Sequence, residues 1–138
     1  MFSTMRRVSK KLAGPLVFLR LLPVFAEYQP KPALKSPVRG YLVDMYCVRE
    51  RKAEGVNLGK EHTRLCLQMP PCVKSGYAVM TADNQVLKFD DKGTQKAMKL
   101  LGKSSQDKGY VVQVSGKISG NEIQVSKIEF LPPDALQE

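Results

Sequence analysis

The chain of 138 residues contains no tryptophan, a single histidine and only three cysteines. It has neither a glycine-rich phosphate-binding loop nor a Gly-x-Ser-x-Gly motif, so the usual marks of a nucleotide-binding enzyme or a serine hydrolase are missing. It also lacks an uninterrupted apolar run of about 18 residues, so we expect no integral membrane segment after processing. The length fits one domain and excludes a large multidomain enzyme.

Acidic residues are absent before Glu27, although the whole chain has a formal net charge of +9. Residues 1–39 hold eight basic side chains and one acidic side chain, whereas the remainder holds 14 basic and 12 acidic ones. The excess of positive charge therefore lies in the N-terminal segment. Because the rest of the chain is nearly balanced, its charge does not favour a nucleic-acid partner.

Residues 1–26 have the pattern of a cleavable targeting segment. Basic residues precede an apolar stretch that ends in Val24-Phe25-Ala26, which is the arrangement of a secretory signal and predicts a periplasmic or secreted protein. Arg20 interrupts the apolar stretch, and an arginine-rich segment without acids also fits a mitochondrial presequence. An accessory subunit of a mitochondrial complex is therefore an alternative. Residues 27–37 contain three prolines and are predicted to form a linker.

Residues 38–131 alternate between strand patterns and short helical patterns, and residues 132–138 form a tail. The order of five strands with a helix before the last two predicts a mainly β fold, a small OB-like barrel with a Cys/His insertion after the first strand. A mixed α+β sheet is the alternative. Gly40 predicts a bulge or a close backbone approach, and a change of phase between Val125 and Ile128 predicts a bulge. Strands are expected at residues 38–43, 77–81, 85–89, 110–118 and 122–130, a helix at 94–101, and a core from Leu42, Tyr77, Val79, Leu87, Phe89, Leu100, Val112, Val114, Ile123 and Val125.

The three cysteines and the histidine all lie within the insertion. A helix expected over residues 61–69 would place His62 and Cys66 one turn apart on the same face. Cys72 follows two prolines, and Cys47 follows the first strand. Three thiols and an imidazole match the tetrahedral demand of zinc, and soft thiolates near a methionine also suit copper(I). The sequence thus predicts a site for Zn or Cu at Cys47, His62, Cys66 and Cys72.

Other interpretations of the same residues stay open. In an oxidising compartment Cys66 and Cys72 could form a disulfide, which would leave Cys47 as a spare thiol. A catalytic pair of Cys66 and His62, oriented by Asp44, is less favoured because no motif provides an oxyanion site, and Asp44 more simply caps the turn after the first strand. An OB-type single-strand binder would need aromatics on its strands, but most of the candidates are expected in the core. These are Tyr41, Tyr77, Phe89 and Tyr110.

Several segments together resemble a group of small exported bacterial proteins that have no assigned function. The segments are Gly40 to Cys47, Phe89-Asp90, Val114-Ser115-Gly116 and, as the most specific, the His-Thr-x-x-Cys-x-x-Met-Pro-x-Cys-x-x-Ser-Gly-Tyr run from His62 to Tyr77. The resemblance implies export, an OB-like domain and a shared site around the cysteines and His62. It implies no reaction. We therefore predict a non-enzymatic module that binds a metal ion or a protein partner.

Overall fold

The computed structural model describes residue 14 and residues 30–137. The predicted targeting segment therefore lies outside the described residues except for Gly14, as does the first part of the predicted linker. The compact unit comprises Pro32–Glu138. Leu34 packs against its core, and the Ser36 hydroxyl accepts a hydrogen bond from the Gly116 N–H over 3.1 Å. In the described residues, none of the helices is both long enough and apolar enough to span a membrane.

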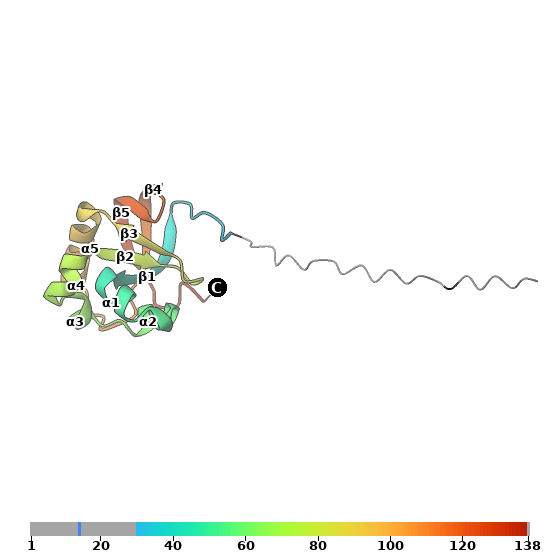
Figure 1. Cartoon of the computed structure of the whole chain (residues 1–138). Helices are drawn as coiled ribbons and strands as arrows, with labels where there is room; N and C mark the ends of the chain where they lie inside the picture. Colours follow the sequence, from blue (N-terminus) through green and yellow to red (C-terminus); the bar gives the residue numbers. More distant parts are fainter. Residues whose placement is uncertain (1–13, 15–29, 138) are drawn as a thin grey trace, which may run out of the picture. The chain divides into compact units, whose positions relative to one another are not determined.

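Five strands form one mixed sheet, which confirms the predicted mainly β class (Figure 1). All pairs are antiparallel except β3 with β5, which is parallel. The strands close in the order β1-β2-β3-β5-β4. The strand bounds are β1 Val38–Asp44, β2 Tyr77–Met80, β3 Val86–Phe89, β4 Val111–Ser119 and β5 Glu122–Leu131.

The interior of the sheet is filled by the side chains that the strand alternation had marked. Nine of the ten predicted core residues are buried, but the helix contributes Leu101 and Ala97 in place of Leu100, which is half-buried. Gly40 lies where a Cβ would come within 2.3 Å of the Met80 carbonyl oxygen, so the predicted close approach of two backbones is confirmed. The predicted bulge is also confirmed, because the register of β4 and β5 shifts so that no β4 residue is paired with Ser126.

Helices are more numerous than the one or two that we predicted. The insertion between β1 and β2 contains four short α-helices, and one longer helix, α5, follows β3. Figure 1 shows α1 to α4 gathered beside β1 and β2, so the insertion forms a compact group next to the barrel. The bounds are α1 Met45–Glu50, η1 Lys52–Glu54, α2 Val56–Glu61, α3 Arg64–Leu67, α4 Pro70–Ser75 and α5 Asp91–Lys103.

The predicted helix over residues 61–69 is wrong. His62 and Thr63 have extended backbones, and they separate α2 from α3. Thr63 caps α3 by accepting a hydrogen bond from the Cys66 N–H, and the 107–109 segment pairs with this break through the bridge of Thr63 with Lys108. Pro70 begins α4 rather than ending a helix, which suits its missing N–H. Tertiary pairing therefore divides a segment whose periodicity favoured one helix.

Candidate metal centre

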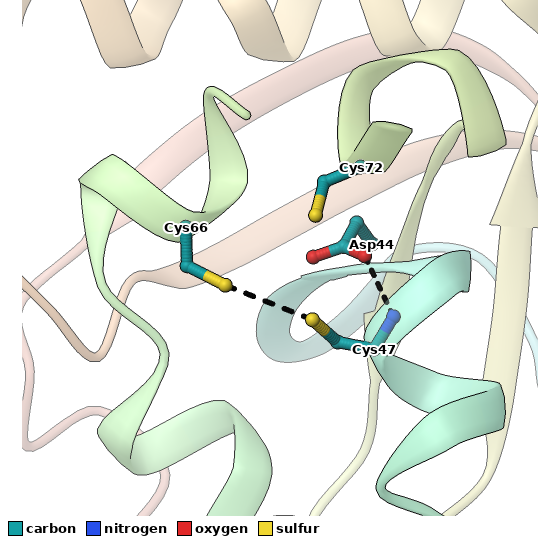
Figure 2. Close-up of side chains that lie close together, drawn as sticks. All are labelled: Asp44, Cys47, Cys66 and Cys72. Carbon is teal, nitrogen blue, oxygen red and sulfur yellow. Dashed lines mark hydrogen bonds between the residues drawn. The ribbon is translucent and has the colours of Figure 1, made fainter. Parts of the chain in front are cut away.

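Three thiols and one carboxylate converge in the insertion (Figure 2). The Sγ atoms of Cys47, Cys66 and Cys72 and a carboxylate oxygen of Asp44 all lie within 4.8 Å of one another. The four residues come from α1, α3, α4 and the end of β1. Asp44, Cys47 and Cys72 are buried, and Cys66 is half-buried. The sequence predicted that the cysteines gather, and the structure brings all three together.

Asp44 is placed by the junction between strand and helix. It is the last residue of β1, where it pairs with Tyr77 of β2, and it is also the N-cap of α1. Its Oδ1 accepts the Cys47 N–H over 2.8 Å. The predicted capping role is confirmed, and the cap fixes the carboxylate beside the residue that carries the first thiol.

Cys66 and Cys72 are held by hydrogen bonds that fix their helices. Thr63 Oγ1 accepts the Cys66 N–H over 3.1 Å, and the Tyr77 hydroxyl donates to the Leu67 carbonyl over 2.6 Å, which ties α3 to β2. The Ser75 hydroxyl donates to the Cys72 carbonyl over 2.6 Å and accepts the N–H of Tyr46 in α1. Both thiols therefore stand on backbone that is anchored to neighbouring elements.

His62 lies behind Asp44 and not among the four converging donors. Its Nε2 is 2.6 Å from Asp44 Oδ2, and both side chains are completely buried. The extended backbone at residue 62 ends the expected helical relation to Cys66, which is why the imidazole meets the carboxylate instead. Its Nδ1 is buried without a hydrogen-bond partner. Carboxylates that bind metal ions are themselves held by hydrogen bonds from groups outside the ligand set, and His62 stands in such a position behind Asp44.

The electrostatics of the cluster oppose free thiolates. Burial raises the pKa of Cys47, and the negative charge of Asp44 adds to the increase. The same two causes raise the pKa of Cys72 to about 11. Burial alone would raise the pKa of Asp44, but the hydrogen bonds from His62 and from the Cys47 N–H lower it below its ordinary value. Two of the thiols are therefore kept protonated beside an ionised carboxylate unless a cation replaces the protons.

The distance between two of the sulfur atoms bears on the two predicted states of the cysteines, which are a disulfide and a metal site. All three cysteines are free in this structure, and the Sγ atoms of Cys47 and Cys66 lie 3.7 Å apart. A disulfide needs an S–S distance of about 2.05 Å. A tetrahedral zinc ion with Zn–S bonds of about 2.3 Å places its sulfurs about 3.8 Å apart. The observed spacing is that of two thiols in contact and not of a disulfide, and it is also compatible with two ligands of one zinc ion.

Asp44 is the donor that the sequence analysis missed, because we considered it only as a cap or an orienting group. The signal was present in its spacing. An N-cap side chain reaches the backbone N–H three residues later, so an aspartate three residues before a cysteine places a carboxylate next to that cysteine. Asp44 and Cys47 have this spacing. The cap and the donor are one residue.

Comparisons with models of protein families, with curated proteins and with solved structures found no match to this chain.

Proposed function

We propose that this protein is a small non-enzymatic metal-binding module whose ligands are Cys47, Cys66, Cys72 and Asp44. The observation that carries the proposal is the convergence of four donor atoms within 4.8 Å from four separate elements. A bound ion would join α1, α3 and α4 to the end of β1. Its binding free energy would then contribute directly to the stability of the insertion.

Zinc is the ion that this donor set favours. Thiolates suit both zinc and copper(I), but a carboxylate is a hard donor that zinc accepts more readily than copper(I) does. Four protein ligands complete a tetrahedron, whereas catalytic zinc sites keep one position for water or substrate. The set of Asp44 and three cysteines therefore supports a structural or storage role for the ion rather than catalysis. Copper(I) is the second candidate, supported by the three thiols.

Two further parts of the proposal concern the fold and the compartment. The closed strand order β1-β2-β3-β5-β4, with α5 between β3 and β4, supports an OB-like barrel. The pattern of residues 1–26 supports export, with mitochondrial import as the alternative. Binding of single-stranded nucleic acid is not supported, because the four candidate aromatic side chains are at most 5% exposed and offer no surface on which bases could stack. They are Tyr41, Tyr77, Phe89 and Tyr110.

The test is metal analysis of the full chain purified without chelator. We expect one zinc ion per chain by elemental analysis, and a cobalt-substituted protein with sulfur-to-cobalt charge-transfer absorption. Cys66→Ser should weaken that absorption, since one of three thiolates is lost. Asp44→Asn should lower zinc affinity while it preserves the cap, because asparagine caps helices as well as aspartate does.

Asp90→Asn is the matched control. Asp90 also caps a helix after a strand, but none of the three thiols is grouped with it. This variant should bind zinc like the unmodified protein. Three titratable free thiols in a folded chain that takes up no zinc would contradict the proposal, and stoichiometric copper in place of zinc would select the second candidate.

A further inference from the structure

A cavity of about 510 Å³ lies on the outer side of the insertion, between the α1–α2 segment and the β2–β3 hairpin. This volume falls within the range of small-molecule sites in proteins. Apolar side chains from both segments line it, including Val48, Leu58, Met80 and Val86. All four belong to, or pack against, the apolar cluster that contains the cysteines. The cavity is therefore a recess in the wall of that cluster.

Basic side chains line one side of the recess. Arg49, Arg51 and Lys52 line it, and none of the described residues that line it is acidic. Arg51 makes a two-fold hydrogen bond with Glu54, with both distances at 2.7 Å. Arg49 and Lys52 are exposed and have no ion pair within the part of the chain that the structure describes. Two cations at the mouth of an apolar recess are thus available to an external anion.

The two walls of the recess are tied to each other. Asn84, in the turn between β2 and β3, accepts the Val56 N–H at the start of α2 over 2.6 Å. Asn84 has a positive φ of 66°, and a Cβ on Gly55 would come within 2.8 Å of the Asn84 Oδ1, so this contact requires glycine. Asn84 also lines the cavity. Because the walls are fixed, a ligand would meet a preformed site.

We propose that this recess binds a single-chain amphiphilic anion, a medium-chain carboxylate whose apolar tail lies on Val48, Leu58, Met80 and Val86 and whose carboxylate meets Arg49 and Lys52. The inference goes beyond metal binding and does not depend on it. An uncharged apolar ligand would leave the two cations without a partner. A small anion without a tail would leave the apolar floor in contact with water, so the two features together specify the ligand class.

The test is nuclear magnetic resonance titration of the isotope-labelled full chain with octanoate, octanol and acetate. Octanoate should shift amide signals of residues 48–58 and 80–86. Octanol should bind there about tenfold more weakly because it lacks the charged contact, and acetate should cause no saturable shift there. Since the readout is residue by residue, binding by the basic residues before Glu27 is distinguished from binding in the recess.

Variants separate the recess from general positive charge. Arg49→Gln with Lys52→Gln should lower octanoate affinity about tenfold and leave octanol unchanged. The matched control is Lys99→Gln with Lys103→Gln, which removes the same charge beside a smaller cavity of about 240 Å³ and should have no effect. Ala53→Phe, at an exposed position that lines the recess, should fill it and abolish binding of octanoate while the chain stays folded.

Equal affinity for octanol and octanoate would overturn the proposal. So would equal weakening of octanoate binding by the control pair, or octanoate shifts that leave residues 48–58 and 80–86 unaffected.

Discussion

The junctions at Asp44 and Asp90 are built alike. Each aspartate lies where a strand ends, Asp44 as the last residue of β1 and Asp90 directly after β3. Each caps the next helix by accepting the backbone N–H of the residue three positions later, over 2.8 Å from Cys47 and over 3.0 Å from Gly93. At Asp90 the same Oδ1 also accepts the Val125 N–H over 3.1 Å, and the side chain is half-buried. At Asp44 the second oxygen meets His62, and the carboxylate is fully buried beside three thiols.

The difference between the junctions lies in what surrounds the cap. After Asp90, α5 is a regular helix whose buried residues pack on the barrel, so the cap serves the fold alone. After Asp44, α1 is only 6 residues long. Two further short helices, α3 and α4, place the thiols of Cys66 and Cys72 near the same carboxylate. The local signal in the sequence is the same in both places. Burial and neighbours decide whether a capping carboxylate is also a ligand.

The largest effect should come from removing the two carboxylates in turn. In metal-free protein, Asp44→Ala should lower the free energy of unfolding by about 3 kcal/mol or more, because it removes a cap and leaves His62 buried without its partner. Asp90→Ala should cost about 1 to 2 kcal/mol, as expected for a cap with an additional hydrogen bond. Urea denaturation in the presence of chelator measures both. Equal losses would show that the two junctions do not differ energetically.

Zinc should stabilise the junction at Asp44 and leave the junction at Asp90 unchanged. At a free zinc concentration a hundredfold above its dissociation constant, the protein should gain about 2.7 kcal/mol of stability. Hydrogen exchange should show added protection in α1, α3 and α4, and little change in α5 under conditions where local openings dominate. Cys66→Ser should remove the difference between zinc and chelator. Protection that rises only in α5 would mean that zinc binds elsewhere.

His62 should affect zinc through Asp44. His62→Leu removes the donor to Asp44 Oδ2 and should weaken zinc binding about 10- to 100-fold. His62→Gln places an amide N–H near the position of Nε2 and should restore most of the affinity. Competition with a chromophoric chelator gives both constants. If the glutamine variant binds as weakly as the leucine variant while both stay folded, orientation of the carboxylate is not the role of His62.

The smallest effect concerns Tyr77, which lies between the two junctions. Its hydroxyl donates to the Leu67 carbonyl, and its N–H donates to Thr94 of α5. Burial raises its pKa from 10.0 to about 12. Because the unfolded chain ionises first, the stabilisation is complete below pH 10 and is lost as the pH rises toward 12. The contribution lost by pH 11 is on the order of 1 kcal/mol.

Other groups also titrate in this range, so the measurement is a difference. The free energy of unfolding of the unmodified chain should fall more steeply than that of Tyr77→Phe between pH 9 and 11. Parallel profiles would show that Tyr77 does not carry the alkaline sensitivity.

The strands could be predicted from the sequence because their signals are local. Alternation at residues 110–118, the turn at Gly120 and the missing side chain at Gly40 each constrain the backbone where they occur. The buried positions followed from the same alternation. The Leu100 assignment failed because two adjacent leucines leave the helix phase open, and only tertiary packing of the helix against the core selects Leu101.

The insertion could be predicted only in part. Its cysteines cluster in the sequence, so their convergence was foreseeable. The position of His62 was not, because the break after Glu61 depends on the bridge of Thr63 with Lys108, which is 45 residues away. No local pattern reports such a pairing. The same break moved the imidazole from the set of donors to the rear of Asp44.

The four proposed ligands are close together in the sequence, whereas the strands that close the sheet are far apart in the sequence. All four lie between residues 44 and 72, but closure of the barrel needs Val38 to pair with Val114. Loops that join nearby residues close at a lower entropic cost and more quickly than those that join distant ones. During synthesis from the N-terminus, every ligand is present before β4 is made. Binding of the proposed ion and closure of the sheet are therefore events that a growing chain could complete at different times.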